Sequence, residues 1–308
     1  MSCCTPLVSI IIPTYNSASF ITEAIDSCLM QTYTKFEIIV INDGSTDNTD
    51  EVVLKYIDKI TYIKQENAGA ARARNLGIAE AKGDYIAFLD ADDIWITDKL
   101  QKQIEIMKRN PNIALVYGKF ENFSEGTNEI LSIMPDSIQS GFLFDHILIN
   151  NLIGLSSVLV RKSVLDEVGS FDERLLTAED TNLWLKIAYK YPFGVVSEIL
   201  FRRRIHGGNI SERVDIKVGT LDNLDWIVEL YPEVSPKKYT PMKEAYLIKG
   251  EAMAVDMFHG GAYSKCNAVC KKLITMNVSN AKILIYFVIT LLPASLISKF
   301  RNAMRFFR

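Results

Sequence analysis

Gly83-Asp84-Tyr85-Ile86-Ala87-Phe88-Leu89-Asp90-Ala91-Asp92-Asp93 is the stretch that decides the fold. Its apolar run, Tyr85 to Leu89, follows a glycine and has the length of a buried strand. Three carboxylates come directly after that strand. Crowded carboxylates repel one another unless a cation lies among them, and Mg²⁺ or Mn²⁺ prefers oxygen ligands. The alternative is a solvated acidic loop that also caps the next helix, because Asp is common at turns and N-caps. If the loop does bind a metal, we expect Asp93 to be a helix cap and not a third ligand.

Two earlier strands also end in polar residues. Leu7 to Ile12 is a continuous aliphatic run that stops at Pro13-Thr14-Tyr15-Asn16, and Phe36 to Ile41 stops at Asn42-Asp43. Runs without alternation indicate burial on both faces, as in a parallel sheet. Segments with helical spacing separate the strands, which predicts an α/β fold with a mostly parallel, doubly wound sheet. Ligands of such sheets bind beyond the carboxyl ends of the strands.

The chain continues with further predicted elements. We expect helices at 97–109 and 180–190, strands at 113–117, 154–160 and 195–200, and a loop or hairpin at 120–140. Pro236 and Pro241 then mark a linker, followed by two helices over 242–276 that are broken at Gly260-Gly261. The sequence therefore predicts one domain over residues 1–235 and a helical extension over residues 236–308.

The extension differs in charge from the rest of the chain. The 308 residues carry a net charge of −3, but no acidic residue follows Asp256, so residues 257–308 carry +8 and the first 256 carry −11. Such a basic segment favours anionic lipid as its partner. Nucleic acid is discounted because the basic groups are interleaved with aliphatic residues.

Residues 283–297 contain no charge, yet these 15 residues are fewer than the ~20 that span a bilayer as a helix. We therefore expect 281–308 to associate with a membrane surface, with its basic residues at the headgroups. The alternative is a buried helix that packs on the protein.

The cysteines and the N-terminus bear on location. The five cysteines show no metal-binding spacing, and their scatter is typical of a reducing compartment. The first residues lack the pattern of a secretory signal. We therefore expect a cytoplasmic protein that is peripherally associated with the inner face of the cell membrane.

Several motifs follow one another in a specific order along the chain. They are Val8 to Asn16, Ile41 to Asp47, Asn67-Ala68-Gly69, Ala73-Arg74-Asn75, Leu89 to Asp93, Gly169 to Glu173, Glu179-Asp180 with Trp184, and His206 with Ser211. Their order and spacing resemble the family-2 glycosyltransferases of GT-A fold, over about residues 6–212. The resemblance implies a Rossmann-like sheet flanked by helices. It also implies transfer of one sugar from a nucleotide-sugar to an acceptor hydroxyl, with inversion at the anomeric carbon.

The same resemblance implies roles for single residues. Asp90-Ala91-Asp92 becomes a DXD motif, in which Asp92 binds Mn²⁺ or Mg²⁺. His206 becomes a further ligand of that metal or a contact of the diphosphate. Asp43 would accept the ring N–H of uracil or thymine, which favours a UDP-sugar over other donors and allows a dTDP-sugar. The nucleotide-sugar would be bound by Pro13, Tyr15, Asp43, Arg74, Asp90 and Ala91, with Arg72 as an alternative to Arg74.

On the acceptor side, the resemblance makes Asp180 the general base, with Glu179 beside it, and places Ser156 near the acceptor. Trp184 lies four residues after Asp180, so the two can share a helix face and Trp184 can offer a stacking surface to the acceptor sugar. The acceptor would be a glycan or a lipid-linked saccharide. Each role has a structural alternative. Thr177-Ala178-Glu179-Asp180 also matches the pattern of a capping box. The alternatives are a core residue for Trp184, a surface ion pair for Arg74 and a surface histidine for His206.

Other classes fit less well. A processive polysaccharide synthase needs a Gln-x-x-Arg-Trp motif and several membrane spans, which this chain lacks. A dinucleotide-binding oxidoreductase needs Gly-x-Gly-x-x-Gly after its first strand, where this chain has Pro13-Thr14-Tyr15-Asn16. An EF-hand needs glycine where the loop that starts at Asp90 has Trp95. A non-catalytic nucleotide-sugar-binding scaffold on a membrane stays open.

Overall fold

The structure is a computed structural model that describes residues 5–175, 177–207, 219–293, 296–297 and 300–301. The chain divides into two compact units, one formed by residues 1–144 and 152–211 and the other by residues 145–151 and 212–308. The sequence predicts a boundary at 235/236 instead. The contacts group α8 (Gly219–Leu230) with the later helices, because Asp225 of α8 accepts a hydrogen bond from Tyr246 of α9 (Thr240–His259) at 2.7 Å.

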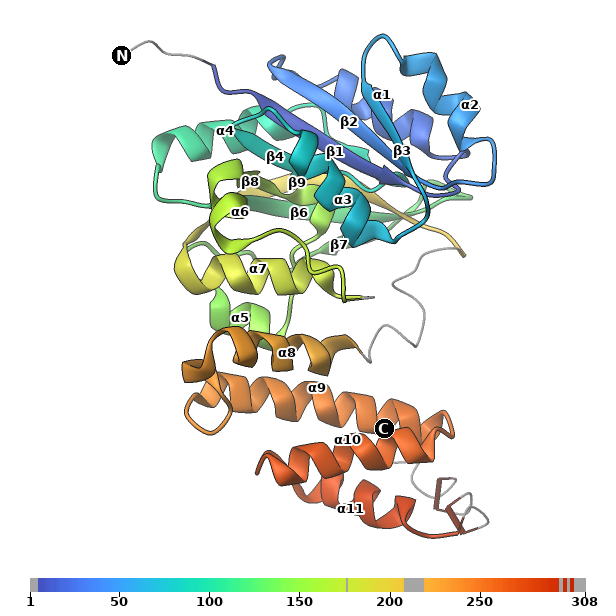
Figure 1. The fold of residues 1–308 in the computed structure, drawn as a ribbon, viewed down its shortest axis with the longest axis vertical. Coiled ribbons are helices and arrows are strands. Elements are labelled where there is room, and N and C mark those ends of the chain that lie inside the picture. Colours follow the sequence, from blue (N-terminus) through green and yellow to red (C-terminus); the bar gives the residue numbers. More distant parts are fainter. Residues whose placement is uncertain (1–4, 176, 208–218, 294–295, 298–299, 302–308) are drawn as a thin grey trace. The chain divides into compact units, whose positions relative to one another are not determined.

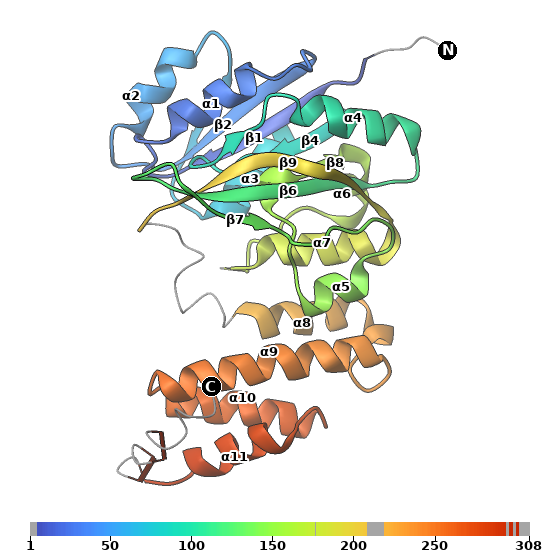
Figure 2. The same ribbon diagram turned by 180° about the vertical axis from the view of Figure 1, so that it is seen from behind.

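A mixed sheet forms the centre of the first unit (Figures 1 and 2). Among the described residues it has nine strands in the order β3-β2-β1-β4-β8-β6-β9-β5, and β7 pairs with β6 beside this path. The strands are β1 (Val8–Thr14), β2 (Phe36–Asp43), β3 (Thr61–Gln65), β4 (Tyr85–Phe88), β5 (Ile94–Trp95), β6 (Leu115–Ser124), β7 (Ile130–Met134), β8 (Leu159–Arg161) and β9 (Phe193–Ile205).

The prediction of a mostly parallel sheet needs correction. In the described part of the chain, four strand pairings are parallel and four are antiparallel. Strand β8 runs antiparallel to both β4 and β6, and the other two antiparallel pairings are those of β5 with β9 and of β7 with β6. Two reversals restore the direction, so β6 and β9 point the same way as β1, β2 and β4. The carboxyl ends of all these strands therefore lie at one edge of the sheet.

Helices cover both faces of this sheet. They are α1 (Ile21–Leu29), α2 (Thr49–Val53), α3 (Ala70–Glu80), α4 (Lys99–Arg109), α6 (Lys162–Val168) and α7 (Glu179–Lys190), with 3₁₀ turns η1 (Leu54–Tyr56) and η2 (Leu155–Ser157). Ile10 packs in one core cluster with Ile25 of α1 and Ile104 of α4. Ile11 faces the other side, as alternation along a strand requires.

Helix α3 packs closely against Ile11. A Cβ added at Gly77 would lie 2.5 Å from Ile11 Cγ2, a distance that real Cβ atoms do not show. Glycine at this position therefore lets α3 rest directly on β1, and that close packing fixes the position of Arg74 one turn earlier.

The second unit is helical. Its elements are α5 (Phe144–Ile149), which begins at the last residue of the first segment, α8, η5 (Pro232–Val234), α9, α10 (Tyr263–Thr275) and α11 (Ala281–Thr290). The predicted break between two helices is confirmed at Gly260-Gly261, where Gly261 adopts a φ of +81°. No helix in the described residues has the length and apolar character needed to cross a membrane.

Helix α11 has two different apolar faces. Ile283, Tyr286 and Ile289 are buried in the helical unit. The opposite face is exposed and consists of Leu284, Ile285 and Val288, with Leu291 just beyond the helix, at 46%, 49%, 59% and 64% exposure. Helix α11 therefore packs within the helical unit along one face, while its other face presents aliphatic side chains to solvent.

Candidate functional site

Strand register brings the predicted residues to one edge of the sheet. Thr14 of β1 pairs with Asn42 of β2, so Tyr15, which follows β1, and Asp43, the last residue of β2, lie at adjacent strand ends. Asp90 comes two residues after the end of β4, which pairs with β1 on its other side. His206 follows the end of β9, which runs in the same direction. The edge therefore combines residues from four strands that lie far apart in the sequence.

The acidic loop from Asp90 to Asp93 forms a tight turn, in which Asp93 N donates to Asp90 O at 3.0 Å. Nε2 of His206 lies 3.0 Å from Oδ2 of Asp92, and the His206 ring packs on Phe20 at 4.8 Å between centroids. Arg204 Nε donates to Asp92 O at 3.1 Å. Asp92 and His206, which the sequence predicts to share a metal, are thus in contact.

Asp93 does not cap a helix, contrary to the interpretation from sequence. Strand β5 follows it directly, and the N-cap of α4 is Asp98. The Asp93 carboxyl is 5% exposed and accepts a hydrogen bond from Ser156 Oγ at 2.6 Å. Burial raises the pKa of Asp93 well above its usual range, and the charges of Asp92 and Asp90 add to this effect.

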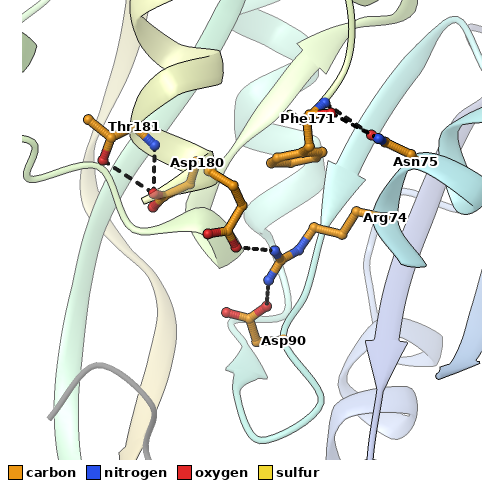
Figure 3. Close-up of polar contacts among 7 residues, drawn as sticks. Arg74, Asn75, Asp90, Phe171, Asp180 and Thr181 are labelled. Atoms are coloured by element: carbon orange, nitrogen blue, oxygen red, sulfur yellow. Dashed lines mark hydrogen bonds and ion pairs between the residues drawn. The ribbon is translucent and has the colours of Figure 1, made fainter. Parts of the chain in front are cut away.

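The Arg74 guanidinium joins two carboxylates of the site (Figure 3). Nη2 lies 2.8 Å from Asp90 Oδ1, and Nη1 lies 2.7 Å from Glu179 Oε1. The Arg74 side chain is only 7% exposed. Burial opposes its charge, but Asp90 and Glu179 outweigh burial and raise the pKa of Arg74 further. Arg74 is therefore a buried link between carboxylates and no surface ion pair, while Arg72 is exposed.

Asp180 lies at the first turn of α7, beside Glu179. Its Oδ1 accepts hydrogen bonds from Thr181 N (2.6 Å) and Thr181 Oγ1 (3.2 Å), as Figure 3 shows. The capping-box alternative is not met, because the N-cap of α7 is Ala178 at a left-handed φ of 59° and has no side-chain cap. Burial and the charge of Glu179 raise the pKa of Asp180 to about 6, against the lowering effects of Thr181 and Arg74. A carboxylate with this pKa is suited to accept a proton near neutral pH.

Asp43 is held by three donors. Its carboxylate accepts from Gln65 Nε2 (2.6 Å), Ala68 N (2.8 Å) and Gly69 N (2.9 Å), so it fixes the start of α3. Its Oδ2 takes only one of these bonds and keeps capacity for another donor. Tyr15, which directly follows β1, is 49% exposed at the same edge.

The two predicted acceptor contacts require correction. Trp184 is fully buried, with its ring 6.5 Å from that of Phe171. Ser156 is 1% exposed, and its hydroxyl is engaged by the acidic loop. Neither side chain is accessible to a sugar here, because Trp184 lies on the buried face of α7 and Ser156 is buried in η2.

Two asparagines of the site have roles that the sequence did not reveal. Asn16, at a φ of 50°, accepts from Thr46 N at 2.8 Å and so ties the loop after β1 to the loop after β2. Asn75 donates to Phe171 O at 2.9 Å and accepts from Phe171 N at 3.0 Å (Figure 3). Asn75 thereby holds the segment before α7 against α3. The position of Asn75 directly after Arg74 in the sequence was the feature that could have indicated a role for it in the site.

The donor set fits a divalent ion that also binds a substrate. Among the described residues, no group of three or more His, Cys, Asp or Glu side chains is placed to hold a metal. Asp92 and His206 supply one hard oxygen and one imidazole nitrogen in mutual contact. Mg²⁺ is usually bound by one or two carboxylates together with substrate phosphates and water, so two protein ligands are sufficient.

The fold is of the GT-A type. The mannosyltransferase PcManGT from Pyrobaculum calidifontis, in complex with GDP-Man and Mn²⁺, is similar with a TM-score of 0.61 and 16% identity. The match covers 98% of this chain and 88% of that one. At this level of identity the similarity establishes the fold alone.

Sequence comparisons then identify the family. The sequence model described as Glycosyl transferase family 2 matches residues 9–169, and this chain therefore belongs to glycosyl transferase family 2. Asp180 and His206 lie beyond the matched residues.

Individual relatives agree with this assignment. An uncharacterized glycosyltransferase of Rickettsia felis is 40% identical over 215 residues, which are 68% of this chain and 36% of that protein. The chain thus spans well under half of that relative. The Escherichia coli protein WfgD, named UDP-Glc:alpha-D-GlcNAc-diphosphoundecaprenol beta-1,3-glucosyltransferase, is 39% identical over 183 residues, which are 59% of this chain and 69% of that protein.

Proposed function

We propose that this protein transfers one sugar from a nucleotide-sugar, preferably a UDP-sugar, to an acceptor hydroxyl with inversion at the anomeric carbon. One observation carries the proposal: a single guanidinium links Asp90 of the acidic loop to Glu179, the neighbour of Asp180. Donor-binding and proton-accepting groups thus belong to one connected site. Family membership supports the same reaction class.

Asp43 would read the base of the donor. The free capacity of its Oδ2 suits the ring N–H of uracil or thymine, and exposed Tyr15 offers a ring that can stack on the base. Pro13 and Ala91 would line the same pocket, and Asp90 would face the ribose. Arg74 acts here through the two carboxylates that it holds, with Asp90 as its link to the donor.

Asp92 and His206 would hold Mn²⁺ or Mg²⁺. A divalent ion supplies positive charge that stabilises a departing diphosphate. The Mn²⁺ complex of the P. calidifontis structure supports a metal in this fold.

Asp180 would act as the general base. It removes the proton of the acceptor hydroxyl while that oxygen forms a bond to the anomeric carbon and the bond to the diphosphate breaks. A pKa of about 6 keeps Asp180 mostly ionised at pH 7, yet more basic than an ordinary Asp. A single displacement of this kind inverts the anomeric centre.

The acceptor would be a lipid-linked saccharide or glycan at the cytoplasmic face of the membrane. The name of the E. coli relative contains a diphosphoundecaprenol-linked acceptor, which supports a lipid-linked substrate. The exposed aliphatic face of α11, within a segment of charge +8, supports contact with an anionic lipid surface.

The test is a screen of the full chain against UDP- and dTDP-sugars with and without Mn²⁺, in which slow release of the nucleoside diphosphate is measured. We expect metal-dependent release with at least one UDP-sugar and its loss in Asp180→Asn. Binding without release in both proteins would indicate a non-catalytic scaffold. The donor assignment fails if no uridine or thymidine sugar gives a metal-dependent response.

A further inference from the structure

The Ser156 hydroxyl closes the acidic loop from inside the domain. Its Oγ accepts a hydrogen bond from Asp90 N at 3.1 Å and donates one to Asp93 Oδ2 at 2.6 Å. Asp90 and Asp93 are the first and last residues of the turn, so one hydroxyl contacts both of its ends. Ser156 and Asp93 are 1% and 5% exposed, so the contact between them is buried, while the Asp90 side chain at the other end of the turn is 37% exposed.

Ser156 is itself firmly held. Its carbonyl oxygen accepts a hydrogen bond from Trp95 Nε1 at 2.8 Å, and the neighbouring carbonyl of Ser157 accepts one from Gln103 Nε2 at 2.7 Å. Trp95 and Gln103 are 3% and 0% exposed. The 3₁₀ turn η2 is therefore a rigid support, fixed by buried side chains of β5 and α4.

We propose that Ser156 is a positioning residue, whose hydroxyl holds the loop of Asp90 to Asp93 in the turn that directs Asp92 toward His206. The inference rests on the proposed function for the role of Asp92, but the loop geometry is independent of it. It also replaces the role predicted from sequence, since Ser156 acts on the donor side of the site and from within.

The neighbouring serine provides a matched control. Ser157 lies in the same 3₁₀ turn and is 0% exposed, but its Oγ donates to Gly154 O at 2.7 Å, within its own turn. Alanine at either position removes one buried hydroxyl. Only Ser156→Ala leaves Asp90 N–H and the Asp93 carboxyl without this partner, and a buried polar group without a partner is costly.

The experiment compares wild type, Ser156→Ala and Ser157→Ala in the full chain with two measurements. The first is amide hydrogen exchange at Asp90, and the second is the affinity for Mn²⁺ in the presence of UDP, measured by calorimetry. We expect faster exchange and roughly 10- to 100-fold weaker binding for Ser156→Ala, the usual effect of losing a group that supports a metal ligand. Ser157→Ala should resemble wild type in both.

Equal exchange at Asp90 in the two variants would overturn the inference. If wild type itself does not bind Mn²⁺ with UDP, the proposed function fails, while the exchange comparison still decides whether Ser156 holds the loop. Ser156→Cys, which keeps the volume and replaces the hydroxyl with a weak S–H donor, serves the same comparison if alanine prevents folding.

Discussion

Asp90 and Glu179 are joined by one guanidinium, since Arg74 donates to Asp90 at 2.8 Å and to Glu179 at 2.7 Å. The first carboxylate follows a strand of the central sheet, and the second opens a helix that carries Asp180. A planar fork with several donors can bridge two carboxylates in this way, whereas a lysine presents a single charged point. Donor and acceptor sides of the proposed site are therefore coupled through Arg74.

Arg74→Met should destabilise the first unit. The Arg74 side chain is 7% exposed. Its replacement leaves the Glu179 carboxylate, which is 18% exposed, without a cation, while Asp90, which is 37% exposed, can be hydrated by water instead. Breaking a buried pair costs several kcal/mol and solvent screening reduces this, so we expect a loss of about 2–3 kcal/mol. Urea denaturation measures it. Arg72→Met, at an exposed position of the same helix, should stay within about 0.5 kcal/mol of wild type; an equal loss in both variants would contradict the buried link.

Glu179→Gln should shift the pH dependence of activity downward. Burial and then the charge of Glu179 raise the pKa of Asp180 to about 6, so removal of that charge lowers this pKa while burial keeps it above 3.8. The rate needs ionised Asp180 and rises with pH through its pKa, so the acid limb moves to lower pH. Profiles of kcat/KM between pH 4 and 8 measure the shift. Glu173→Gln removes an exposed carboxylate and should leave the acid limb of the kcat/KM profile unchanged. A shift of that limb to higher pH in Glu179→Gln would refute this account.

Asp180→Asn should lower kcat by about 10²- to 10⁴-fold, the usual contribution of a general base. It should also stabilise the protein at neutral pH. The pKa of Asp180 rises from 3.8 in the unfolded chain to about 6 in the folded protein, so the folded state binds the proton more tightly. The free energy of unfolding therefore decreases as the pH rises from 3.8 through 6. Asparagine avoids that loss, which is about 2 kcal/mol after solvent screening, because Asp180 is only half-buried.

Denaturation of Asp180→Asn and wild type at two pH values tests the sign. The variant should be more stable at pH 8, and the difference should vanish below the unfolded pKa of 3.8, where Asp180 is neutral in both states. A variant that is less stable than wild type at pH 8 would show that the folded state does not disfavour the ionised form of Asp180.

The strand ends could be predicted because the information is local. An apolar run followed by polar residues identifies the end of β1, β2 and β4 without any knowledge of the partners. The reversal at β8 could not be predicted. The sequence predicts one strand over 154–160, but Leu155–Ser157 forms η2, and the direction of β8 depends on its pairing with β4 and β6.

The grouping of the candidate site residues at one edge of the sheet could be predicted in part for the same reason. Asp90, Asp92 and Asp180 follow from motifs, but the partners of Arg74 are 16 and 105 residues away in the sequence. The burial of Trp184 and Ser156 likewise depends on which face of each element meets the core. Helical spacing cannot distinguish a side chain that faces a substrate from one that faces the interior.

The exposed face of α11 should bind lipid. Leu284→Gln and Val288→Gln change side chains at 46% and 59% exposure, so the fold should tolerate them. Burial of aliphatic surface contributes about 25 cal/mol per Å², and basic residues add attraction to anionic lipid, so each variant should bind phosphatidylglycerol vesicles several-fold more weakly. Co-sedimentation of the full chain measures this. Leu54→Gln and Ile57→Gln, exposed at 46% and 49% in the first unit, are the controls. Equal binding by all four variants would show that the exposed face of α11 takes no part in the proposed membrane contact. Equal binding of the wild type to neutral and anionic vesicles would show that the surrounding basic residues take no part in it.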